Sequence, residues 1–264
     1  MARIGVAATA PFGADVLERL AAEHDVAFLL TRPDRPAGRG RHATAPPAKD
    51  AAERLGIPVL QPERLDASVE LSEDTVVAVA YGALVPSPLL ERHRWLNVHP
   101  SLLPRWRGAA PVERAIMAGD PETGVTIIEL VEELDAGPIA AQRAFPIESD
   151  DDAGSIYAKA APVAVALLDD ALGGAELHPQ PAEGTTYAEK ITAADRELDW
   201  SRPPGELLNR IRALSPHIGA RAELDGRPVI VWRAHLADGR VEPLEVQPEG
   251  KRRMTVEEFR RGLR

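Results

Sequence analysis

The chain contains no cysteine in its 264 residues, and aromatic residues make up only 4% of it. Without cysteine it can have no disulfide bond, thiolate zinc site, iron–sulfur cluster or cysteine nucleophile. The longest uncharged run, residues 75–90, is interrupted by Gly82, Pro86 and Pro88, so we expect no membrane span. The N-terminus reaches Asp15 before any long apolar stretch, and with no recognisable signal peptide we expect a cytoplasmic protein.

The rest of the composition is typical of a globular protein, with 44% hydrophobic and 27% charged residues. The length favours two domains. The formal net charge of −10 argues against a general nucleic-acid-binding protein, because such proteins are usually basic. Two segments depart from this balance: residues 31–49 carry five cationic side chains and one acidic, and residues 251–264 carry six and two. Each is either a solvated surface or a place where an anionic partner docks.

Hydrophobic patterning predicts an α/β fold for the first part of the chain. A strand at 3–8, a helix after Pro11 and a strand at 26–30 form a parallel unit. Residues 31–47 contain four prolines and two glycines, so we expect a long loop without regular structure there. Further strands are expected at 76–80, 95–99, 125–130 and 139–145, and helices at 48–55, 111–118 and 153–172.

A connector that contains proline and glycine, residues 177–186, is the candidate domain linker. It separates a predicted first domain, residues 1–176, from a second, residues 187–264. In the second domain a helix at 207–214 is followed by short strands at 221–223, 229–234 and 240–246, a pattern typical of a small β barrel or sheet.

Asn97 and His99 form the first candidate site. If residues 95–98 are a strand, the two side chains project from the same face at its carboxyl end, where open α/β sheets bind ligands. The carboxamide can stabilise an oxyanion and the imidazole can handle a proton. The alternative is a capped strand end with a structural histidine.

Asp135 is the second candidate, because it precedes a Gly137-Pro138 turn between two expected strands. A carboxylate that faces His99 would fix the tautomer of the imidazole and favour its charged form. The alternative is that Asp135 caps its own turn.

These residues lie in two motifs that carry a family resemblance, NVHPSLLPRWRGAAP at residues 97–111 and LDAGP at 134–138. Both resemble signatures of the formyltetrahydrofolate-dependent formyltransferases. Three further segments resemble, more narrowly, the members of this family that act on initiator methionyl-tRNA: PDRPAGRG at 33–40, TYAEKI at 186–191 with DWS at 199–201, and LEVQPEGKRRM at 244–254.

The resemblance implies a Rossmann-like α/β formyltransferase domain and a small, shortened C-terminal β barrel similar to an oligonucleotide-binding fold. It also implies that the protein transfers a formyl group from 10-formyltetrahydrofolate to the α-amino group of initiator methionyl-tRNA, without a metal, and we expect a monomer. Asn97, His99 and Asp135 would be the catalytic trio. The other residues that the resemblance assigns are the folate-binding Ser101, Leu102, Leu103 and Pro104 and the tRNA-binding Arg35, Arg39, Arg41, Lys251, Arg252 and Arg253.

The chain departs from the family pattern at four places. The turn after the first strand is ATAP at residues 8–11, in place of the family's Gly-Thr-Pro, and Glu113 and Glu133 replace the usual Gln and Gly. A longer strand-and-loop segment is missing between residues 234 and 242. Two other functions therefore stay open, a sugar-nucleotide N-formyltransferase and a catalytically silent relative that binds folate or RNA.

Overall fold

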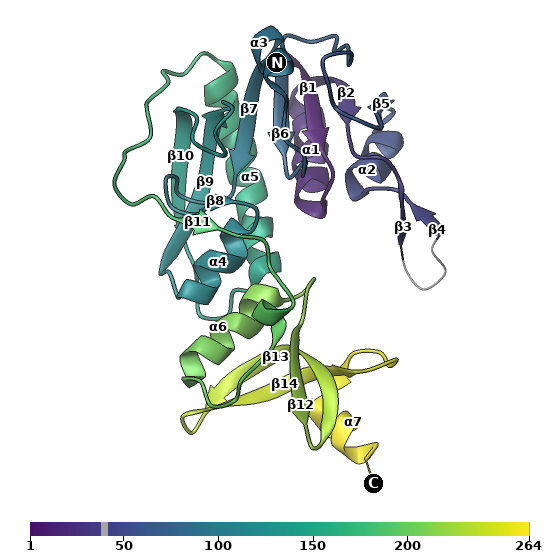
Figure 1. Cartoon of the computed structure of the whole chain (residues 1–264), viewed down its shortest axis with the longest axis vertical. Helices are drawn as coiled ribbons and strands as arrows, with labels where there is room; N and C mark the ends of the chain where they lie inside the picture. Colours follow the sequence, from purple (N-terminus) through teal and green to yellow (C-terminus); the bar gives the residue numbers. More distant parts are fainter. Residues whose placement is uncertain (38–41, 264) are drawn as a thin grey trace. The chain divides into compact units, whose positions relative to one another are not determined.

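The computed structural model describes residues 1–37 and 42–263, and these residues form two compact units (Figure 1). The first, called here the sheet unit, consists of Met1–Arg107, Gly124–Ala144 and Ala158–Thr186. The second, the C-terminal unit, consists of Gly108–Thr123, Phe145–Tyr157 and Tyr187–Arg264. The domain limits drawn from the sequence at 176 and 187 stay a prediction.

The sheet unit is built on a seven-stranded sheet with the order β10-β9-β7-β6-β1-β2-β5 (Figure 1). The five strands from β7 to β5 run parallel, and β9 is antiparallel to β7. Short apolar runs make the central strands suitable for burial on both faces. The α/β class expected from the sequence is confirmed. The strands are β1 (Arg3–Ala8), β2 (Asp25–Leu30), β5 (Val59–Leu60), β6 (Thr75–Val79), β7 (Arg94–His99), β9 (Glu122–Glu129) and β10 (Ile139–Pro146).

Proline starts most of the helices, because its missing N–H is not needed in the first turn. It stands at the first or second position of α1 (Pro11–Glu23), α2 (Pro47–Leu55), α3 (Ser87–Arg92), α4 (Pro111–Ala118) and α6 (Pro204–Leu214). The 20-residue α5 (Ala153–Leu172) is the longest helix in the described part of the chain. None of the helices among the described residues is long and apolar enough to cross a membrane.

The core of the sheet unit gathers around Trp95, which is 1% exposed and donates its indole N–H to the carbonyl of Leu89 at 3.0 Å. Phe28, Leu30 and Val76 belong to the same buried cluster. This packing fixes β7 at the point where the chain carries its candidate site residues.

The segment 31–47 differs from the sequence expectation. It contains two short strands, β3 (Arg35–Ala37) and β4 (His42–Thr44), which pair antiparallel with Arg35 opposite Thr44. The expectation of no regular structure was therefore wrong. Proline and glycine exclude a central strand, but they do not exclude a short two-stranded pair that lies outside the main sheet.

The C-terminal unit contains a four-stranded antiparallel sheet with the order β12-β13-β14-β15. β13 and β14 form a hairpin whose turn residues, Asp238 and Gly239, have φ of 48° and 74°, as a two-residue turn of type I′ requires. The turn lies between residues 234 and 242, where we expected the chain to lack a longer segment. Besides α4 and α6, the elements here are β12 (Ala220–Leu224), β13 (Arg227–Ala237), β14 (Arg240–Pro248), β15 (Met254–Thr255), α7 (Val256–Arg261), the short strand β11 (Tyr187–Ala188) and the 3₁₀ turn Ala194–Arg196. The short strand β8 (Arg107–Gly108) has one residue in each unit.

An ion pair between Arg114 and Asp195 holds residues 189–195 against α4. Arg114 on α4 donates to both carboxylate oxygens of Asp195, at 2.8 and 3.1 Å, and also to the carbonyls of Glu189 and Lys190. The main-chain N–H and hydroxyl of Thr192 donate to the same carboxylate. The Arg114 guanidinium and these donors hold the pKa of Asp195 well below its ordinary value.

We expect Asp195→Asn to lower the free energy of unfolding at pH 7 by about 1–3 kcal/mol, the usual cost when a charged group loses hydrogen bonds. Because folding lowers the pKa of Asp195, its contribution is complete well above the ordinary value of 3.8 and is lost as the pH falls below it. Urea unfolding from pH 7 to pH 3 should show a constant difference between the two proteins until the pH falls below the ordinary value, where the difference begins to narrow. A difference that does not change with pH would contradict this role.

Candidate active site

Strand β7 carries two of the three candidate catalytic residues to the carboxyl edge of the sheet. The order of the parallel strands reverses between β1 and β6, and β7 lies beside β6. Asn97 and His99 are two residues apart in β7, so their side chains leave the same face. His99 is 4% exposed. The expected strand position of this pair is confirmed.

Asp135 reaches both side chains from the connection between β9 and β10. Its Oδ1 accepts from Asn97 Nδ2 at 3.4 Å, and its Oδ2 lies 3.6 Å from His99 Nδ1. Asp135 is buried and has a φ of +49°, an uncommon conformation outside glycine. Gly137 is required in this motif because a Cβ there would lie 1.7 Å from the carbonyl oxygen of Glu129.

The main chain at Trp106 sets the tautomer of His99. His99 Nε2 lies 2.8 Å from the carbonyl oxygen of Trp106, and since a carbonyl can only accept, Nε2 carries a proton. Nδ1 is then the nitrogen that faces Asp135 and is available for proton exchange. Trp106 has a φ of +66° and donates its N–H to the hydroxyl of Thr186 at 2.9 Å. The sequence motif contained Trp106, but nothing in it pointed to its carbonyl.

The loop after β7, which holds the predicted folate residues 101–104, is tied to neighbouring strands. Buried Thr126 on β9 donates its hydroxyl to the Ser101 carbonyl at 2.6 Å and accepts the Leu103 N–H at 3.2 Å. Gln142 on β10 donates to the Leu103 carbonyl at 3.0 Å and to the Thr126 hydroxyl at 2.8 Å. Ser101, Leu103 and Pro104 are buried, whereas the side chain of Leu102 is partly exposed.

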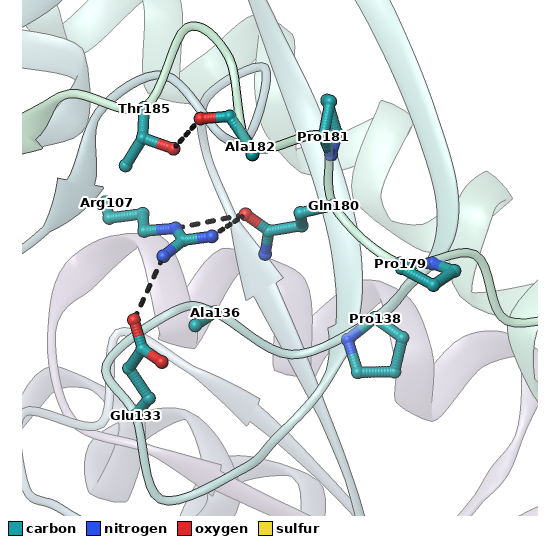
Figure 2. A pocket seen from close by; sticks show the side chains of 9 residues that line it. All are labelled: Arg107, Glu133, Ala136, Pro138, Pro179, Gln180, Pro181, Ala182 and Thr185. Carbon is teal, nitrogen blue, oxygen red and sulfur yellow. Dashed lines mark hydrogen bonds and ion pairs between the residues drawn. The ribbon is translucent and has the colours of Figure 1, made fainter.

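A pocket of about 480 Å³ opens beside the Asp135 loop (Figure 2). The Arg107 guanidinium donates from Nε and Nη2 to Gln180 Oε1, at 3.1 and 2.8 Å, and its Nη1 lies 3.3 Å from Glu133. Glu133 is therefore an ion-pair partner of Arg107. The remaining lining residues are Ala136, Pro138, Pro179, Pro181, Ala182 and Thr185.

The predicted tRNA-binding residues have different surroundings. Arg35 is exposed at the start of β3, and Arg39 and Arg41 lie outside the described residues. Lys251 and Arg252 are exposed between β14 and β15. Arg253 stacks on Trp232 with its guanidinium carbon 3.5 Å from the ring centre, and it donates to the Pro216 carbonyl, so its side chain already has a structural role.

Thr9 and Glu113, which we expected to depart from the family pattern, each have defined contacts. Thr9, in the altered turn, donates its hydroxyl to the Tyr81 carbonyl at 2.8 Å. Glu113 contacts the hydroxyl of Tyr157, which lies 3.3 Å from each carboxylate oxygen. Burial raises the pKa of Glu113, and burial together with that carboxyl raises the pKa of Tyr157 well above its usual value.

One group of side chains in the described part of the chain has the spacing of a metal site: Glu23, His24 and Asp169. The Ala2 main-chain N–H donates to His24 Nδ1 at 3.2 Å, so the ring proton is on Nε2, which lies 2.9 Å from Asp169 Oδ1. A metal would need the lone pair of Nε2. The group therefore fits a structural contact rather than a metal.

We expect Thr126→Val to lower the free energy of unfolding by about 1–3 kcal/mol, because it leaves a buried N–H and a buried carbonyl in the loop without their partner. Thr123→Val is the matched control on the same strand. The Thr123 hydroxyl is buried and has no hydrogen-bond partner among the described residues, so its loss should be neutral or stabilising. Equal destabilisation of the two variants in chemical unfolding would contradict the bracing role of Thr126.

Comparison with known proteins agrees with this geometry. Residues 3–172 match the model of the formyl transferase family, and residues 190–242 match the C-terminal domain of formyl transferases. The chain is 41% identical over 284 residues to a methionyl-tRNA formyltransferase of Paracoccus denitrificans, covering 97% of this chain and 95% of the relative. It is 46% identical over 255 residues to one of Halorhodospira halophila, covering 91% and 82%.

A solved structure shares the fold at low sequence identity. An N-formyltransferase of Helicobacter canadensis, in complex with folinic acid and dTDP-3-aminofucose, superposes with a TM-score of 0.69 at 18% identity, covering 97% of this chain and 99% of that one. The family match spans more than half of the chain, and the relatives match it nearly from end to end. This chain belongs to the formyl transferase family.

Proposed function

We propose that the protein transfers a formyl group from 10-formyltetrahydrofolate to the α-amino group of initiator methionyl-tRNA. The observation that carries the proposal is the meeting of Asn97, His99 and Asp135 at one edge of the sheet. The choice of acceptor rests on the relatives that match nearly the whole chain, which are methionyl-tRNA formyltransferases.

Formyl transfer requires accurate positioning of the two reactants more than it requires a strong base. An α-amino group has a pKa of about 7.7–8.0, so part of it is already neutral near pH 7. Its nitrogen attacks the formyl carbon to form the new C–N bond and a tetrahedral oxyanion, and the bond from that carbon to N10 breaks as this intermediate collapses. The amine loses a proton and N10 gains one. Correct placement of the two reactants can contribute about 7–11 kcal/mol.

We assign the charge and proton handling to the trio. Asn97 Nδ2 would donate to the formyl oxygen as it becomes an oxyanion. His99, whose Nε2 proton is held by the Trp106 carbonyl, would use Nδ1 to stabilise the intermediate and move the proton. Asp135 would orient the imidazole and stabilise its charged form.

The formyl donor is assigned to the loop at residues 101–104. Leu102 is partly exposed beside the buried Leu103, and it offers apolar surface close to His99 for a reduced pterin ring. The neighbour with the same fold from Helicobacter canadensis is in complex with folinic acid, a related ligand. No step in the proposed reaction calls for a metal.

The tRNA is assigned to two basic surfaces in an acidic chain. Arg35 is exposed in the segment that also contains Arg39 and Arg41, and Lys251 and Arg252 are exposed in the C-terminal unit. Phosphate contacts by such side chains supply most of the affinity for nucleic acids. We further propose that the enzyme acts as a monomer in the cytoplasm, where translation takes place.

A sugar-nucleotide acceptor is the second candidate. It is supported by the same fold in the N-formyltransferase whose structure contains dTDP-3-aminofucose. Incubation with the formyl donor and either methionyl-initiator tRNA or an amino-sugar nucleotide separates the two. Formylation of the tRNA supports our proposal, transfer to the sugar alone supports the rival, and binding without turnover indicates a silent relative.

Asn97→Ala and Asp135→Asn are each expected to reduce the single-turnover rate of tRNA formylation at least tenfold. One lost oxyanion donor typically costs about 2.7–4 kcal/mol. Asp15→Asn, an exposed carboxylate on α1 paired with Arg19, is the control and should keep the wild-type rate. Rates within tenfold of wild type for both site variants would overturn the assigned roles.

Arg35→Ala and Arg39→Ala should each raise the KM for methionyl-tRNA and leave the slow hydrolysis of the formyl donor unchanged. The physical reason is the loss of a phosphate contact, which also predicts a weaker dependence on salt concentration. Arg19→Ala removes an exposed arginine elsewhere and is the matched control. Equal loss of formylation and hydrolysis would mean that the segment supports the active site instead.

A further inference from the structure

Gln180 connects two parts of the candidate site through its side-chain amide. Its Nε2 donates to the main-chain carbonyls of Asp135 and Gly137, at 2.7 and 2.8 Å. Its Oε1 accepts from Nε and Nη2 of Arg107, at 3.1 and 2.8 Å (Figure 2). Both donors and both lone pairs of one amide are therefore used, which fixes its orientation.

The loop that carries Asp135 needs support from outside, and we call the four hydrogen bonds of the Gln180 amide the brace. The four residues before it, 131–134, are exposed, and Asp135 itself is buried in the left-handed region of φ. This conformation is uncommon outside glycine, and in this loop it is combined with burial of the carboxylate. Within the loop, the Ala136 N–H bonds the Glu133 carbonyl at a long 3.3 Å. The two short bonds from Gln180 act on both sides of that contact.

On its other side, Gln180 binds Arg107, which lies next to the residue that contacts His99. Arg107 directly follows Trp106, whose carbonyl binds His99 Nε2. The Arg107 N–H donates to the Thr186 carbonyl at 2.9 Å, and the Trp106 N–H donates to the Thr186 hydroxyl at 2.9 Å. The Trp106 carbonyl thus contacts the imidazole, while the side chain of the next residue, Arg107, is bound to the carboxylate loop through Gln180.

We propose that Gln180 is a positioning residue for formyl transfer. It holds the Asp135 loop so that the carboxylate stays within reach of His99 Nδ1 and Asn97 Nδ2. Its bonds go to the main chain of the loop and to Arg107, so it acts through Asp135 and not on the substrates. This inference rests on the proposed function, because the trio is assigned to the reaction there.

Gln180→Glu separates the two roles of the Gln180 amide, which donates to the Asp135 loop and accepts from Arg107. The carboxylate still accepts from Arg107, but it loses both donors and faces two carbonyl oxygens. We expect kcat to fall about 10- to 100-fold, the effect of a displacement of about 1 Å at a reacting group, while the KM values for both substrates change less than about threefold. Gln180→Leu removes both the donated and the accepted hydrogen bonds and should lower kcat at least as much.

Ser68→Ala is the control. It removes an exposed hydrogen bond to the Asp66 carboxylate, outside the pocket lining and the Asp135 loop, so kcat should remain that of the wild type. If Gln180→Glu keeps wild-type kcat and Gln180→Leu does not, Gln180 serves only to hold Arg107, and the proposal fails. It also fails if Gln180→Leu lowers kcat as much in an Asp135→Asn background as in the wild type, since a residue that acts through Asp135 must lose its effect there.

Hydrogen exchange tests the brace without any substrate. Gln180→Leu should speed exchange of the main-chain N–H groups at residues 133–137 and leave those of β1 and β6 unchanged. Unchanged exchange at 133–137 would overturn the proposal whatever the acceptor. If the wild type shows normal protection but does not formylate methionyl-tRNA, the proposed function fails and the brace stands.

Discussion

The site depends on a buried carboxylate that faces a carboxamide and an imidazole. Burial of an ionised group is costly unless charge partners and hydrogen bonds compensate it. Asn97 donates to Asp135 from β7, and the His99 imidazole on the same face of that strand lies 3.6 Å from the carboxylate. The strand is rigid because β6 and β9 flank it, whereas the carboxylate arrives on a loop. The fold must therefore bring that loop to the strand and keep it there.

Residues 178–186 hold much of this arrangement in place, although the sequence suggested them only as a linker. His178 pairs with Ile139 at the start of β10 through two main-chain bonds of 2.8 and 2.9 Å. Gln180 holds the Asp135 loop, and Thr186 binds Trp106 and Arg107. A segment with two prolines and little regular structure is suited to this role because its main-chain groups are not committed to a helix or a main-sheet strand and can bond elsewhere.

Prediction from the sequence succeeded where a local pattern carries the information. Helices α4 and α5 were expected with the bounds that they have, and β7 with the alternation that puts Asn97 and His99 on one face. Short elements such as α3, β15 and α7 were not expected, since six residues or fewer give little periodicity. The β3–β4 pair was excluded wrongly on composition.

The sequence by itself determined the class of the sheet and the family, and it singled out Asn97, His99 and Asp135 as candidates, because buried strands, turn residues and motif spacing are local properties. Only the tertiary structure decided that Asp135 meets His99, that the Trp106 carbonyl sets the imidazole tautomer and that Gln180 bridges Arg107 and the Asp135 loop. These contacts join residues from 7 to 73 positions apart. Their partners are main-chain carbonyls and single amides, which leave no pattern in a sequence and exist only once the chain has folded.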